Sequence, residues 1–109
     1  MFYTFEQNNS GGKFDLDLNA GIGHYVIIEA NDSEEANDRA ESIGLYFNGV
    51  GTGVDCECCG NRWYRNCYDG DSEPTIYGKP VVFLNCPDTV EPSFVHYSDG
   101  TIKHITQGV

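Results

Sequence analysis

The chain has 109 residues, of which 39% are hydrophobic and 13% aromatic, and it shows no internal repeat, so we expect a single domain with one core. A count of 17 acidic against 6 basic side chains gives a net charge of −11, which argues against nucleic acid or an anionic membrane as a direct partner. No stretch approaches the roughly 18 consecutive apolar residues of a membrane span.

Alternating side chains in the first third of the chain predict strands. Residues 1–6 alternate aromatic and polar side chains, which is typical of a strand. Residues 14–18 alternate strictly, with three apolar side chains on one face and two aspartates on the other, and predict a half-buried strand. Because a turn-forming cluster separates them, the two segments should pair as an antiparallel hairpin. Residues 24–29 are nearly all apolar and predict a central strand buried on both faces.

The next segment carries the start and stop signals of a helix. Asp32 is suited to cap its N-terminus, with Glu35 three residues later as the reciprocal partner. Gly44 occupies the position where a left-handed residue ends a helix, and Leu45 can then fold back onto it. One narrow apolar face is made by side chains at helical spacing, namely Ala36, Ala40 and Ile43.

The second half of the chain predicts shorter elements around a loop-rich segment. Residues 45–47 suit a short strand, residues 79–84 suit another, and the cysteine-rich stretch at about 48–78 is expected to be an insertion between them.

A hairpin is predicted at the C-terminal end. Residues 94–97 and 102–105 flank an Asp-Gly pair at 99–100, which is typical of a two-residue type I′ turn and would set His96 opposite Lys103. Together these elements predict an α+β fold: a mainly antiparallel sheet of about five strands, with one helix packed on it and a cysteine-rich loop insertion.

The N-terminus and the cysteine count indicate a cellular compartment. The first residues contain no basic region followed by an apolar run, so no secretory signal is expected and a reducing cytoplasm is favoured. In that compartment, an odd number of cysteines is better explained by metal binding or free thiols than by disulfides.

Four of the five cysteines lie in the stretch DCECCGNRWYRNCY. Cys56 and Cys59 form a Cys-x-x-Cys-Gly knuckle, in which a tight turn lets two thiolates reach one tetrahedral ion. Cys67 and Cys86 are the natural further ligands of a structural zinc ion, although Cys58 or a histidine could substitute. The alternative is that all of them are reduced thiols, partly buried as small apolar groups.

Two segments are candidates for contact with a partner protein. The outward face of the helix carries a run of acidic residues, which is either a solvated face or a surface for a basic partner: Asp32, Glu34, Glu35, Asp38 and Glu41. In the cysteine stretch, Trp63 lies between Arg62 and Arg65, and such residues often anchor interfaces. Trp63 could instead cover a metal or fill a gap beneath the loop.

Signatures of catalysis are missing from the sequence. His24, His96 and His104 fall on predicted strands without an acidic residue at a telling spacing, and neither a nucleophile elbow nor a metalloprotease helix is found. We therefore expect a protein that is not an enzyme. An enzyme that uses Cys67 or a metal-bound water is the alternative.

The pattern VIIEANDSEEANDRAESIGLYF, followed by DCECCGNRWY, resembles small accessory proteins carried by tailed bacteriophages. The resemblance runs from Tyr25 to about Tyr64. That group has no assigned activity, so the resemblance implies a setting only: the cytoplasm of an infected bacterial host. Small acidic phage proteins of that setting often block host nucleases or defence complexes, some by imitating the charge of DNA.

These observations predict a binding protein that inhibits or redirects a host protein with a basic surface, for example a nucleic-acid-binding or defence enzyme. One alternative is a protein that sequesters a small nucleotide-like signal in a basic pocket, for which Arg39, Arg62, Arg65 and Lys79 are the candidates. The other is a zinc-stabilised structural protein. The sequence predicts no oligomeric state.

Overall fold

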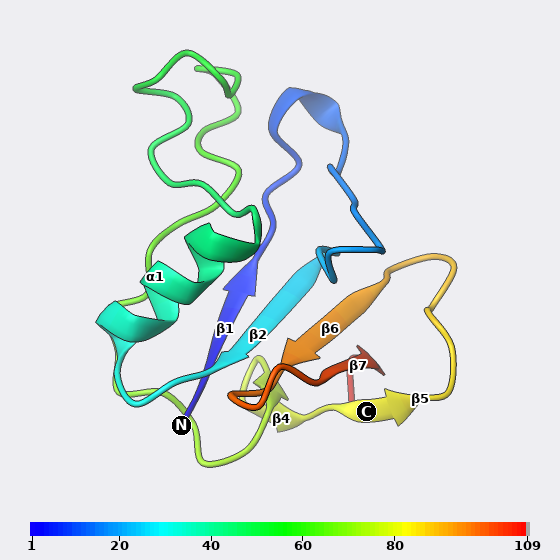
Figure 1. Ribbon diagram of the computed structural model, residues 1–109. Helices are drawn as coiled ribbons and strands as arrows, with labels where there is room; N and C mark the ends of the chain where they lie inside the picture. Colours follow the sequence, from blue (N-terminus) through cyan, green and yellow to red (C-terminus); the bar gives the residue numbers. More distant parts are fainter. Residues whose placement is uncertain (109) are drawn as a thin grey trace.

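The computed structural model describes residues 1–108 and shows a five-stranded sheet with the helix α1 (Ser33–Ile43) on one face (Figure 1). The strand order is β1-β2-β6-β7-β5, and every neighbouring pair is antiparallel except β2 and β6. These strands are β1 (Phe2–Glu6), β2 (Tyr25–Glu29), β6 (Ser93–His96), β7 (Ile102–Thr106) and β5 (Val82–Leu84). The predicted α+β fold is confirmed. Within the described residues, no helix has the length and apolar character needed to cross a membrane.

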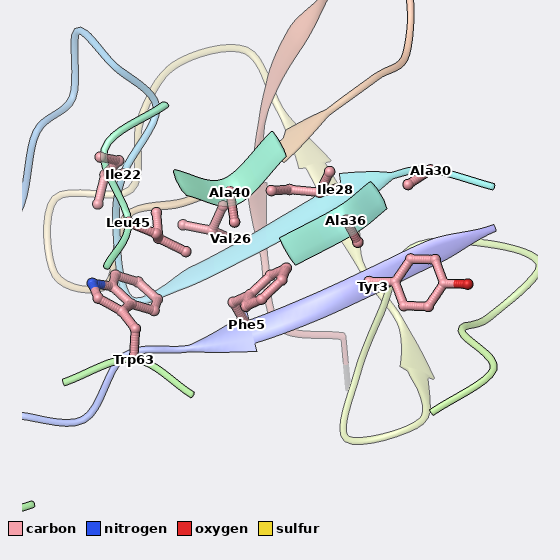
Figure 2. Packing of buried hydrophobic residues seen from close by; sticks show 10 residues of the cluster. All are labelled: Tyr3, Phe5, Ile22, Val26, Ile28, Ala30, Ala36, Ala40, Leu45 and Trp63. Carbon is pink, nitrogen blue, oxygen red and sulfur yellow. The ribbon is translucent and has the colours of Figure 1, made fainter. Parts of the chain in front are cut away.

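Strand β2 lies in the middle of the core, as predicted. Val26 and Ile28 face α1 and pack with Ala36 and Ala40 (Figure 2), while Ile27 points to the opposite face. On that opposite face the core is completed by a small hairpin of β3 (Thr75–Ile76) and β4 (Lys79–Pro80), whose Ile76 is fully buried. Because both faces are covered, an apolar strand is stable there.

The helix begins and ends where its sequence signals predict. The Asp32 carboxylate accepts a hydrogen bond from the Glu35 backbone N–H at 2.8 Å, and the Glu35 carboxylate reaches back to Asn31. Gly44 has φ 119°, and the N–H of the buried Leu45 donates to the carbonyl of Ala40. Both ends of α1 are therefore capped by the chain itself.

The predicted hairpin between residues 1–6 and 14–18 does not form. Strand β1 pairs with β2 instead, in a register that buries Tyr3 and Phe5 under α1. Residues 14–18 are not a strand, and their apolar side chains are 41–50% exposed. The alternation does not decide the pairing, because β2 offers β1 three consecutive apolar residues, Val26, Ile27 and Ile28, whereas residues 14–18 carry two aspartates.

The outer edge of β1, where that hairpin would have formed, is occupied by residues 66–71. Asp71 exchanges two backbone hydrogen bonds with Phe2, and the Asn66 side chain donates to the Thr4 carbonyl. The Tyr68 hydroxyl accepts from the Thr4 N–H at 2.8 Å. A distant part of the cysteine-rich segment thus protects an edge that would otherwise be open to pairing.

The C-terminal hairpin forms in a register one residue away from the prediction. His96 lies opposite Ile102, because the Tyr97 N–H bonds to the Thr101 carbonyl and closes a three-residue loop. Gly100 is left-handed with φ 92°, but Asp99 is not, whereas a type I′ turn needs both. The loop is thus longer by one residue than the Asp-Gly signal predicts.

Two other expectations need correction. Residues 45–47 are not a strand, since the chain leaves the helix cap directly into the loop. Residues 79–84 divide at Val81 into β4, which pairs with β3, and β5, which pairs with β7. The remaining short element is the 3-10 turn η1 (Ser10–Gly12).

Candidate functional site

A buried carboxylate organises the cysteine-rich loop. The Asp55 side chain is only 1% exposed and accepts hydrogen bonds from the Tyr46 hydroxyl and the Arg62 N–H, both at 2.8 Å. Gly49 packs so closely on it that a Cβ there would lie 1.9 Å from Oδ2. Asp55 therefore holds together the two ends of the segment that carries Cys56, Cys58 and Cys59.

Arg62 fastens this loop to the N-terminal part of the chain. Its guanidinium donates to Gln7 Oε1 at 2.9 Å, to the Ser10 carbonyl at 2.8 Å and to the Lys13 carbonyl at 2.9 Å, and its Nε donates to the Tyr46 hydroxyl at 3.1 Å. The residue is 8% exposed. Arg62 is therefore a structural centre, and its expected role at a partner-binding surface is corrected.

Trp63 is also buried and is 2% exposed. Its indole packs beside Phe5 and Leu45 in the core beneath α1 (Figure 2). The structure thus favours the alternative that Trp63 fills the space under the loop, and its side chain is not available to a partner. Of the three residues in the expected patch, Arg65 alone is exposed. It reaches Glu41 at 3.5 Å and lies 4.8 Å above the Phe47 ring.

Three cysteines at the tip of the loop form a thiol cluster. The sulfur atoms of Cys56, Cys58 and Cys59 all lie within 4.8 Å of one another, with 3.0 Å between the first two. A tight turn produces this approach, because the N–H groups of Cys59 and Gly60 both point to the Cys56 carbonyl. The left-handed Gly60, with φ 87°, allows the chain to turn away afterwards.

Cys56 and Cys58 do not ionise independently. Hydrogen bonds from the Cys58 and Cys59 side chains and N–H groups lower the pKa of Cys56 to about 7. Side-chain hydrogen bonds with Cys56 and Cys59, together with the negative charge of those sulfur atoms, raise the pKa of Cys58 to about 11. A thiolate that is populated near neutral pH is both a nucleophile and a ligand for soft metal ions. The cluster can therefore hold a metal ion.

The structure does not bring two of the expected metal ligands, Cys67 and Cys86, to the thiol cluster. Cys67 lies on the segment that covers β1, Cys86 lies in the loop after β5, and both are exposed and outside the thiol cluster. Cys58, which the sequence offered only as a substitute, takes part. Among the described residues, no further His, Cys, Asp or Glu joins the group within 4.8 Å.

The acidic helix face is open to solvent. Asp32, Glu34, Asp38 and Glu41 are exposed, while Glu35 is half-buried and bonds back to Asn31. Arg39 does not neutralise this face, because its guanidinium donates to the backbone carbonyls of Glu29 and Tyr97 at the sheet. Arg65 pairs with Glu41 at one end of the face, whereas Glu34 and Asp38 form no ion pair among the described residues, so the exposed charge of the face is mainly negative.

Sequence reasoning missed a hollow of about 450 Å³ beside the end of β1, lined by Glu6, Gln7, Asn8, Asn9, Phe14, His24 and Tyr64. Within the part of the chain that the structure describes, no lysine or arginine side chain lines it. The basic residues named for a nucleotide pocket are engaged at separate places, with Arg39 at the sheet and Arg62 in the loop. The sequence did not reveal this hollow, because the alternation of residues 14–18 predicted that Phe14 would be buried, whereas its side chain is exposed.

The chain was compared with known proteins at the level of families, single proteins and structures. A family model described as a domain of unknown function (DUF7296) matches residues 1–109. No curated protein and no solved structure matches the chain.

Proposed function

The chain belongs to the DUF7296 family, a domain family of unknown function, and we propose that it is a non-enzymatic binding protein for a partner with a basic surface. One observation carries this proposal: the acidic helix face is exposed, while Arg39 is bound to the sheet and Arg65 pairs with Glu41 alone. Three exposed carboxylates, those of Glu34, Asp38 and Glu41, lie on α1, and Asp32 caps its N-terminus. Because α1 is capped at both ends, its backbone holds these residues at a fixed spacing.

Electrostatic complementarity would supply the speed and specificity of this binding. A net charge of −11 attracts a basic protein over distances comparable with the Debye length of roughly 8 Å at physiological salt. The partner class that fits is a nucleic-acid-binding or defence enzyme of a bacterial host, which the protein would inhibit or redirect within the infected cell. The resemblance to phage accessory proteins supports that setting.

The test reverses the charge of the acidic helix face. Glu34→Lys, Asp38→Lys and Glu41→Lys are combined in one variant, and partners retained from a bacterial extract are quantified at low and high salt. A matched control reverses three exposed acids elsewhere, Glu57, Asp69 and Glu73.

We expect retention by the wild type and the control variant, loss with the helix variant, and displacement of the partner by added DNA. A partner that the helix variant retains equally well, independently of salt, would refute the proposal.

A second function is favoured by the thiol cluster: we propose that Cys56, Cys58 and Cys59 hold one thiophilic metal ion, with zinc as the first candidate. Zinc accepts three protein ligands and one water in open sites, and thiolates are among its preferred ligands. The bound ion would stiffen the loop tip, which is otherwise exposed.

Native mass spectrometry with and without a chelator tests this second function. We expect the mass of one zinc ion on the wild type and on Cys86→Ser, and its loss in Cys59→Ser. A bare mass in the presence of excess zinc, or zinc retained by Cys59→Ser, would contradict the assignment.

A further inference from the structure

We propose that the hollow beside β1 binds a guanidinium group, as carried by an arginine side chain. The inference deepens the proposed function, because a basic partner would present such a group. It stands on three separate properties of the hollow: a fixed carboxylate, exposed aromatic walls, and an amide oxygen that makes no hydrogen bond within the described residues.

Glu6 supplies the negative charge. Its Oε2 accepts hydrogen bonds from the hydroxyls of Tyr25 at 3.3 Å and Tyr77 at 2.5 Å, which hold the carboxylate in place. Both donors bind the same oxygen, so Oε1 remains able to accept from a ligand. The Glu6 carboxylate favours a cation and repels a phosphate, and none of the described residues that line the hollow is a lysine or an arginine.

Phe14 and Tyr64 supply flat apolar surface. Phe14 is 41% exposed and Tyr64 is 56% exposed, so neither ring is buried in the core and both can contact a ligand. The Phe14 ring centre lies 4.6 Å from that of His24, which itself stacks on Tyr25 at 4.3 Å. This aromatic wall is therefore supported from behind. A planar guanidinium stacks on such rings better than a compact ammonium does.

Asn8 adds a neutral acceptor to the hollow. Its amide nitrogen donates to the carbonyls of Cys59 and Asn61, which leaves Oδ1 without a hydrogen bond among the described residues. Together with Glu6 Oε1, Asn8 Oδ1 offers a second oxygen to a ligand with several N–H donors, and guanidinium carries five.

The test titrates ¹⁵N-labelled protein with N-acetyl-arginine amide and follows the backbone amide resonances by NMR. We expect saturable shifts at the residues that line the hollow, and weaker binding of N-acetyl-lysine amide. Glu6→Gln should weaken binding about tenfold or more, because it removes a charge-assisted hydrogen bond. Phe14→Ala should weaken it about threefold or more through loss of the stacking contact.

Matched controls keep the interpretation specific. Glu73→Gln removes an exposed carboxylate elsewhere, and Leu16→Ala removes an exposed apolar side chain from the same segment as Phe14 without touching the hollow. Both should bind N-acetyl-arginine amide like the wild type. Absence of saturable shifts, or equal binding by Glu6→Gln in a folded protein, would overturn the proposal.

Two further ligands identify the source of the guanidinium. Tighter binding of an arginine-containing basic peptide than of free arginine assigns the hollow to a partner's side chain, and the reverse assigns it to the free amino acid. Charge reversal of the acidic helix face should leave this small-molecule binding intact. A failed partner assay and a failed arginine titration can therefore be told apart.

Discussion

Replacing Arg62 tests whether the loop depends on one buried guanidinium. Arg62→Met keeps much of the side-chain volume but removes donors from Gln7 Oε1, from the Tyr46 hydroxyl and from the carbonyls of Ser10 and Lys13. It also leaves the Asp55 carboxylate, 3.9 Å from the lost Nε, without a cation.

We expect the free energy of unfolding to fall by about 3–5 kcal/mol, the range seen when one partner of a buried ion pair is removed. Single hydrogen bonds to a charged group contribute about 1.5–3 kcal/mol each, but several of the freed acceptors share the same loop, so the effects will not add. The loss is a large part of the roughly 5–15 kcal/mol that stabilises an ordinary domain.

Urea unfolding followed by Trp63 fluorescence measures this loss, since the indole is 2% exposed in the folded state. Arg65→Met is the control, because Arg65 forms an exposed pair with Glu41 at 3.5 Å and should cost less than about 1 kcal/mol. If Arg62→Met lies within about 1 kcal/mol of the wild type, the guanidinium does not hold the loop and the reasoning is wrong.

Three further outcomes follow from single residues. In metal-free protein, alkylation of Cys56 should rise with a midpoint near pH 7, and Cys58→Ala, which removes the side-chain donor, should move that midpoint upward, as peptide mass spectrometry would reveal. Hydrogen bonds from Ser98 lower the pKa of Glu29, so its stabilising contribution is complete above the ordinary pKa of 4.5 and is lost as the pH falls through the lower folded value. Glu29→Gln should therefore flatten the acid limb of the unfolding curve, and an unchanged limb would contradict the contact. Gly44→Ala should lower the midpoint of thermal unfolding by about 4–8 °C, for a cost near 1 kcal/mol at a left-handed residue, and an unaltered midpoint would disprove that strain.

Local signals predicted the parts of the fold that depend on neighbouring residues. Asp32 and Gly44 marked the ends of α1 correctly, because a cap is decided within one helical turn. The apolar run of β2 predicted its central position, since a strand that is apolar on both sides can be stable only with both faces covered.

The failures concern contacts between distant residues. Residues 14–18 alternate like a strand, yet the edge that they would need is taken by Asn66, inside the cysteine stretch, and by Asp71, just after it. Arg62 looks like a surface anchor in sequence, and only the convergence of Gln7 and Ser10 around it makes burial favourable. Neither of these long-range contacts produces a periodic pattern of residues in the sequence.

The parallel pairing of β2 with β6 also has a consequence for the way the chain folds. The two strands are far apart in the sequence. Tyr25 and Ser93, for example, are separated by 68 residues and share a hydrogen bond. The entropy of closing so long a loop must be overcome before the centre of the sheet gains its contacts, so slow folding is expected. On the ribosome, β1, β2 and α1 emerge long before β6. One side of β2 then has no strand to pair with, and a chain cut short after β5 would expose that apolar edge to other chains.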